Sequence, residues 1–118
     1  MNTDDLIKLC SEWQTILRLQ DWNVKCEIKR ANDMLLKDVA GECNWDINSK
    51  VAAISILDPI DYPSDHLEQQ DIEKTLVHEL LHLHYAPFDQ FENDSPEIVN
   101  IEQSINLISE ALVNLRRK

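Results

Sequence analysis

A chain of 118 residues, 43% of them apolar, is long enough to bury one hydrophobic core and too short for two catalytic domains. Aspartate and glutamate number 22 against 11 lysines and arginines, which gives a formal charge of −11 and a long-range field that repels nucleic acids and anionic membranes. We therefore expect a single domain over residues 1–118 that binds neither nucleic acid nor membrane.

The cysteines and the first residues of the chain predict a compartment. Cys10, Cys26 and Cys43 contain no Cys-x-x-Cys pair, and their odd number leaves one thiol over in any pairing, which favours a reducing environment. The N-terminus has neither the basic residues nor the apolar run of a signal peptide, and no stretch is long enough to span a bilayer. A cytoplasmic location is expected.

The first half of the chain is predicted to form one helix and three strands. Apolar residues recur at helical spacing over 3–19, where Thr3 provides a capping residue and acidic residues occupy the first turn. Apolar and charged residues then alternate over 23–30, which indicates a strand with one exposed face. The pattern next predicts a β-hairpin with strands over 39–45 and 51–57.

Two helices are predicted for the second half. The first runs over about 68–85 and is ended by Pro87, and the second begins with Ser95 as N-cap and Pro96 at its first position and continues to about Arg117. Six apolar residues are expected to form the buried stripe of the last helix: Ile98, Ile101, Ile105, Ile108, Leu112 and Leu115. The whole pattern predicts an α+β fold, with a small mixed sheet over two long helices.

Residues 78–82 read His-Glu-Leu-Leu-His and carry the strongest functional signal. Positions four apart share one face of a helix, so His78 and His82 can bind one metal ion while Glu79 lies beside it. The rest of this helix is apolar, and burying these polar residues without a partner would be costly. Metal ligation would remove that cost, whereas the alternative is a chance pattern on an amphipathic surface helix.

A catalytic zinc site usually has three protein ligands and one open position, so a third ligand is needed. Glu102 lies twenty residues after His82, at the border of the apolar stripe of the last helix. Glu97 and Glu110 lie on the same helix, but spacing and facing favour Glu102. Any of the three glutamates can also be an ordinary solvated residue of an acidic protein.

His-Glu-x-x-His followed by a glutamate on another helix resembles the gluzincin metallopeptidases. The size and the order of elements are most similar to the minigluzincins and to small, often phage-encoded proteins of the same design; the arrangement also resembles the repressor-cleaving metallopeptidases of mobile elements. The resemblance spans most of the chain, and its specific part is 78–106. It implies a zincin-like domain with one catalytic zinc ion, a zinc metalloendopeptidase in which Glu79 takes a proton from water and passes it to the leaving nitrogen.

The resemblance also implies roles for four further residues. Asn106 matches the position that orients the first zinc histidine, although it can equally be an exposed helix residue. Tyr85 would hydrogen-bond the developing oxyanion, or simply close the end of the helix. By analogy, the strand over 41–45 would pair with an extended substrate, with Asn44 and Trp45 nearest the metal.

The sequence leaves open the roles of two further histidines and the identity of the substrate. His84 is expected to be a hydrogen-bonded core or edge histidine, and His66 has no assignable role. So small a domain suggests a shallow cleft, and hence a flexible peptide, an exposed protein loop or another copy of the chain as substrate. The alternatives to a peptidase are a catalytically weak zincin-fold module that regulates or binds a partner protein, and a metal-free helical adaptor.

Overall fold

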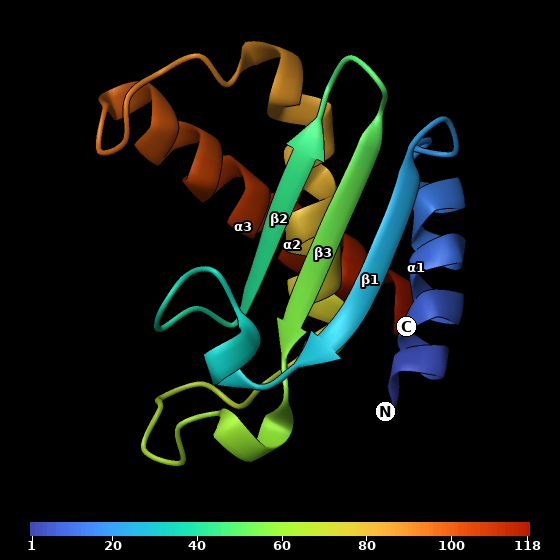
Figure 1. Cartoon of the computed structure of the whole chain (residues 1–118), viewed down its shortest axis with the longest axis vertical. Helices are drawn as coiled ribbons and strands as arrows, with labels where there is room; N and C mark the ends of the chain where they lie inside the picture. Colours follow the sequence, from blue (N-terminus) through green and yellow to red (C-terminus); the bar gives the residue numbers. More distant parts are fainter.

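The fold consists of three α-helices and one three-stranded sheet, seen in a computed structural model of residues 1–118 (Figure 1). In chain order the elements are α1 (Thr3–Ile16), β1 (Asn23–Lys29), β2 (Gly41–Asp46), β3 (Val51–Leu57), α2 (Ile72–Tyr85) and α3 (Pro96–Arg116). The predicted α+β class and mixed sheet are confirmed. None of the helices combines the length and the apolar character needed to cross a membrane.

The sheet has the order β1-β3-β2, so the hairpin strand β2 lies at an edge. β3 pairs in parallel with β1, where Val51 lies opposite Asn23, and antiparallel with β2, where Ile56 lies opposite Gly41. Alternate residues of β3, including Ile54 and Ile56, are buried on the face that the helices cover. The outer side of β2 has no partner strand.

The helices cover one face of the sheet in a defined order. α1 packs against β1 and α2 packs against β2 and β3, while α3 packs chiefly against α2. In Figure 1, α2 lies behind the sheet and the first half of α3 extends past the β2 edge. The core between these elements contains fully buried side chains from every layer, among them Trp13, Ile54, Leu80 and Ile105.

The first helix is shorter than predicted and is capped by a different residue. The Asn2 side chain accepts a hydrogen bond from Asp5 N at 2.8 Å, and the Asp5 side chain accepts one from Asn2 N at 3.2 Å, which makes a capping box. The helix ends at Ile16, since Arg18 has a φ of 64°. The prediction of Thr3 as the cap and of Leu19 as the end was therefore wrong.

The helix that carries the histidines also begins later than predicted, at Ile72 rather than at Glu68. Asp71 is its N-cap and accepts a hydrogen bond from Lys74 N at 3.1 Å. The preceding residue, Gln70, donates to Leu57 O at 2.7 Å and ties the loop to the end of β3. The chain before Asp71 is therefore held in a non-helical path. Likewise, the second strand begins at Gly41 rather than at residue 39.

The buried stripe of α3 differs from the predicted one. Ile105, Ser109 and Val113 are buried, whereas Ile108 is 39% exposed and Leu115 is 64% exposed. The other predicted residues, Ile98, Ile101 and Leu112, are half-buried, so the helix is rotated by a modest angle from the orientation that its apolar pattern alone favours. The prediction that Ile108 and Leu115 are buried was wrong, and the rotation has a consequence for Glu102.

Candidate metal centre

Helix α2 supplies two histidines and a glutamate to one side of the fold. His78 and His82 are four residues apart, about one helical turn, and their ring centroids lie 5.2 Å apart. The other sides of α2 are buried in the core, with Leu76, Val77, Leu80 and Leu83 at most 2% exposed. Core packing therefore fixes the direction in which the two imidazoles point.

Helix α3 brings Glu102 to the same point. Glu102 Oε1 lies 3.0 Å from His82 Nε2, and Glu102 Oε2 lies 3.3 Å from His78 Nε2. One donor atom from each of the three residues falls within 4.8 Å of the others, and this is the group of side chains suited to hold a metal ion. The three residues predicted as ligands therefore converge.

The separations fit a zinc ion. Bonds of about 2.0–2.2 Å in a tetrahedral arrangement hold ligand atoms about 3.3–3.6 Å apart, which lies within the 4.8 Å that bounds the separations of one donor atom from each residue. Two imidazole nitrogens and one carboxylate oxygen are also donors that zinc accepts readily. The same distances allow direct hydrogen bonds, so Glu102 can bind both histidines without a metal. The geometry thus supports a metal site and leaves the metal's identity open.

The charged groups of the cluster shift one another's pKa values. Burial alone would lower the pKa of His78, but the hydrogen bond with Glu102 and the nearby negative charges of Glu79 and Glu102 raise it above its ordinary value. Hydrogen bonds from His78 and His82 hold the pKa of Glu102 well below its usual range. Glu102 is consequently an anion at neutral pH, the form that binds a cation.

Glu79 lies beside this cluster in a different environment. It is 7% exposed, and burial raises its pKa despite the opposing effects of His78 and His82. Its Oε2 atom lies 4.0 Å from His78 Nε2, and it is not one of the three residues that converge. A buried carboxylate with a raised pKa next to a metal site is suited to accept and release a proton.

The only glycine of the chain lies directly opposite Glu79. Gly41 opens β2, and a Cβ atom there would lie 2.7 Å from Thr75 Cγ2 and 3.3 Å from Glu79 Cγ. Strand and helix therefore approach more closely than any side chain at this position would allow. Gly41 sets the distance between Glu79 and the edge strand.

A cavity of about 1250 Å³ runs past the cluster. It is bounded by β2, by residues 31–40, by the loop before α2, and by α2 and α3. Leu57 N donates to Ala40 O at 2.9 Å, and hydrogen-bonded pairs alternate along an antiparallel ladder, so the backbone groups of Gly41, Cys43 and Trp45 point to the free edge. An extended segment can therefore pair with β2 beside the metal cluster.

Of the four remaining predicted site residues, Asn106 and Trp45 line the cavity, whereas Asn44 and Tyr85 do not. Asn106 lines the cavity as an exposed residue near His78, where its side chain contributes the smallest of the effects that raise the pKa of this imidazole. Trp45 stacks on His82, with ring centroids 6.2 Å apart. Asn44, adjacent to it on the strand, faces the other side of the sheet and is exposed. Tyr85 packs against the hydrophobic core and does not line the cavity.

The other histidines and glutamates lie outside the cluster. His84 donates from Nε2 to Leu17 O at 2.6 Å and is an edge histidine, as predicted. His66 accepts from Glu68 N in the loop before α2. Glu110 pairs with Lys74, 3.5 Å apart, and Glu97 is exposed in the first turn of α3.

Two residues next to the site were not identified from the sequence. Glu42 is 4% exposed, and its carboxylate accepts hydrogen bonds from Leu35 N and Leu36 N, at 3.0 and 2.9 Å, which fix the 31–40 segment along the cavity. No sequence pattern distinguishes it from the other acidic residues. Gly41, in contrast, could have been noticed, because a chain with a single glycine is expected to use it where a side chain cannot fit.

Comparisons of the chain with protein-family models, with curated proteins and with solved structures gave no match. Any role for the cluster must therefore be argued from its own geometry. That geometry comprises three converging ligand atoms, one buried carboxylate beside them, and a cavity bordered by a free strand edge.

Proposed function

We propose that this protein is a zinc-dependent metallopeptidase of the gluzincin type that cleaves internal peptide bonds. The observation that carries the proposal is the convergence of His78, His82 and Glu102, from two helices, next to the buried carboxylate of Glu79. A structural zinc site tends to be closed by four protein ligands and needs no base. Three ligands with a buried acid beside them fit a catalytic site better.

His78, His82 and Glu102 would hold the metal. Zinc bound there would supply Lewis acidity and lower the pKa of a water molecule at its open position. Glu79 would accept a proton from that water and later donate it to the leaving nitrogen, for which its raised pKa is suitable. Asn106 would hold the His78 ring in one orientation, more weakly than a carboxylate would.

The substrate proposed is an extended peptide or a flexible protein segment. Its backbone would pair with the free edge of β2, next to Glu79, by strand addition. A net charge of −11 favours segments that carry positive charge, and it disfavours a second copy of this equally acidic chain as substrate. The proposal includes a cytoplasmic location, which three cysteines without a pairing pattern support.

The test combines metal content with hydrolysis. Elemental analysis of purified wild type should give one zinc per chain, and His78→Ala and Glu102→Ala should each lower that content. Glu97→Ala, on the exposed first turn of the same helix, is the matched control and should leave the zinc content unchanged. Glu79→Gln should retain zinc and lose hydrolysis of an unstructured casein substrate. Equal zinc in all of these proteins would remove the proposed site.

The second candidate is a protein-binding or regulatory module in which this cluster does no catalysis. The observation in its favour is that Glu102 lies within hydrogen-bonding distance of both histidines, so the three side chains satisfy each other without a metal. It predicts that wild type and Glu79→Gln behave alike in every assay of partner binding and that neither hydrolyses casein. A metal-free adaptor further predicts protein without zinc.

A further inference from the structure

The rotation of α3 about its axis decides whether Glu102 can reach the two histidines. At about 100° per residue, the centre of the predicted stripe and the centre of the observed packed face differ by roughly 40°, where the observed face comprises Ile98, Ile101, Ile105, Ser109, Leu112 and Val113. The observed orientation buries Ser109, a small polar residue, and leaves Ile108 and Leu115 exposed. Apolar burial alone therefore does not select the orientation that the helix adopts.

Glu102 lies closer to the observed buried face of α3 than to the face that the apolar pattern predicts. On the helical wheel it lies about 50° from the centre of the observed packed face, and roughly 90° from the centre of the predicted one. A rotation of this size would turn the carboxylate away from α2 and out of reach of His78 and His82. Some other interaction must therefore stabilise the observed orientation of α3.

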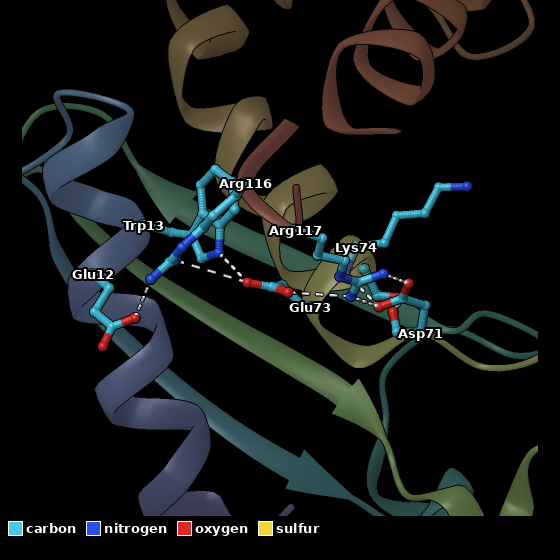
Figure 2. A network of polar contacts seen from close by, with 8 residues as sticks. Glu12, Trp13, Asp71, Glu73, Lys74, Arg116 and Arg117 are labelled. Carbon is cyan, nitrogen blue, oxygen red and sulfur yellow. Dashed lines mark hydrogen bonds and ion pairs between the residues drawn. The ribbon is translucent and has the colours of Figure 1, made fainter. Parts of the chain in front are cut away.

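The structure contains such an interaction at the far end of the helix pair (Figure 2). Arg117, at the C-terminal end of α3, binds Asp71 through two parallel contacts of 2.8 and 2.9 Å and Glu73 through a third of 3.1 Å. Asp71 is itself fixed as the N-cap of α2. Glu73 is fixed by Trp13, whose indole N–H donates to it at 2.8 Å. The guanidinium thus binds two carboxylates that cannot follow it if α3 turns.

Arg117 lies on a side of α3 from which its contacts favour one rotation of the helix. Arg117 and Glu110 project from the same side of the helix as Asn106, within roughly 40° of it, and all three lie opposite the exposed Ile108 and Leu115. Glu110 makes a second contact with α2, through Lys74 at 3.5 Å. Both polar contacts therefore favour the rotation that brings Glu102 to the histidines.

The neighbouring Arg116 acts elsewhere and gives a useful contrast. It binds Glu12 of α1 at 2.6 Å, and its guanidinium carbon lies 5.2 Å from the centre of the Trp13 ring. This residue ties the end of α3 chiefly to α1, and it makes only a longer contact of 3.7 Å with Glu73. Arg117 is the arginine whose contacts are all with the start of α2.

We propose that Arg117 is a positioning residue that holds α3 in the rotation in which Glu102 completes the metal site, against an apolar stripe that favours a different rotation. The inference rests on the proposed function, because it assigns Arg117 a role in metal binding through Glu102. Bidentate contact with a fixed carboxylate restrains the direction of a helix end as well as its distance. Arg117 does not touch the metal site itself.

The test measures zinc affinity by competition with a chelating dye. Arg117→Gln should bind zinc about 2- to 30-fold more weakly than wild type, the range expected for residues that act on a site from a distance. Lys118→Gln makes the same charge change one residue later, where no ion pair is present, and should bind zinc as wild type does. Circular dichroism and urea unfolding establish that each variant is folded.

A second pair of substitutions separates positioning from general stability. Ile108→Gln and Leu115→Gln remove the apolar side chains that only the alternative rotation would bury, and they do not touch the observed core, since both residues are exposed. Combined with Arg117→Gln, they should restore most of the lost zinc affinity, because the alternative rotation no longer buries apolar surface. A purely structural role for Arg117 predicts no restoration.

The possible outcomes separate this inference from the proposed function. If wild type binds zinc through His78 but Arg117→Gln binds it equally well, or if the stripe variants do not restore affinity, the inference is overturned and the metal site stands. If wild type binds no zinc, the proposed function fails and the role of Arg117 fails with it. Weakened binding that the stripe variants restore supports both.

Discussion

Replacing Gly41 with alanine tests whether the close approach of β2 to α2 is built into the site. The added Cβ atom would lie 2.7 Å from Thr75 Cγ2, a separation at which either the Thr75 side chain or one of the two elements must shift. It would also lie 3.3 Å from Glu79 Cγ and 3.4 Å from Glu79 Oε2. The methyl group therefore clashes with the Thr75 side chain and makes a tight contact with the Glu79 side chain.

The expected cost follows from two opposing effects. Inserting a methyl group into a packed contact typically destabilises a protein by about 1–3 kcal/mol. Replacing glycine also restricts the unfolded chain, which stabilises the folded state by about 0.4–1 kcal/mol where the backbone allows it, and Gly41 has no positive φ. The steric effect is the larger, so Gly41→Ala should lower the free energy of unfolding by about 1–2 kcal/mol.

Urea unfolding of wild type, Gly41→Ala, Thr75→Ser and the double variant isolates the contact between residues 41 and 75. Thr75→Ser removes the Cγ2 atom but keeps the hydroxyl that donates to Asp71 O at 3.0 Å. In that background, Gly41→Ala should change the free energy of unfolding by less than about 0.5 kcal/mol, because the closest atom is gone and only the milder contact with Glu79 Cγ at 3.3 Å remains. If Gly41→Ala costs nothing in wild type, or costs the same in both backgrounds, the close approach is not what requires glycine.

Three further changes have defined outcomes. Asp71→Asn keeps an N-cap but loses the ion pair with Arg117, which should cost about 0.5–1 kcal/mol of stability at this exposure. Because the ion pair lowers the pKa of Asp71, its stabilisation is complete above the ordinary pKa of an aspartate and is lost as the pH falls through the lowered pKa. The urea unfolding curves of the variant and of wild type should therefore converge in acid. Burial and the charge of nearby Glu79 raise the pKa of Cys43 to about 12, so alkylation of Cys43 by iodoacetamide at about pH 8 should be roughly 1000-fold slower than that of an ordinary thiol. Comparable rates measured by mass spectrometry would contradict this expectation. Glu42→Gln leaves one backbone N–H of the 35–36 segment without an acceptor and should cost about 1–3 kcal/mol, with faster amide exchange there; unchanged exchange would show that another group holds the segment.

The parts of the structure that local patterns determine were predictable. Helix α2 could be predicted because apolar residues occupy all but one side of it. The position of His84 at an edge followed from its distance of two residues from His82, which turns it away from the polar side. The convergence of Glu102 with the two histidines was predicted from spacing and from a family resemblance, and the geometry agrees with it. Hydrophobic alternation likewise placed β1 and β3 within a residue of their bounds.

Features that depend on tertiary contacts were not predictable. The start of α2 is set by Gln70 binding the end of β3, thirteen residues earlier in the chain, and nothing local signals this. The rotation of α3 is similar: its apolar pattern indicated the burial of Ile108 and Leu115, while ion pairs with α2 favour another face. Periodicity reports which residues prefer burial, and it cannot report ion pairs between elements far apart in sequence.

The two carboxylates of the site support the proposed division of roles independently of any motif. Burial raises the pKa of Glu79, so this group exchanges a proton more readily near neutral pH than an ordinary glutamate does. Two histidine hydrogen bonds lower the pKa of Glu102, so it remains an anion at neutral pH, the form that could bind a cation. Carboxylates whose environments separate their pKa values in this way are suited to different chemical tasks. Because the difference comes from burial on α2 and from hydrogen bonds across to α3, it would be lost if either helix turned, and the orientation of α3 is therefore as much a part of the site as its ligands.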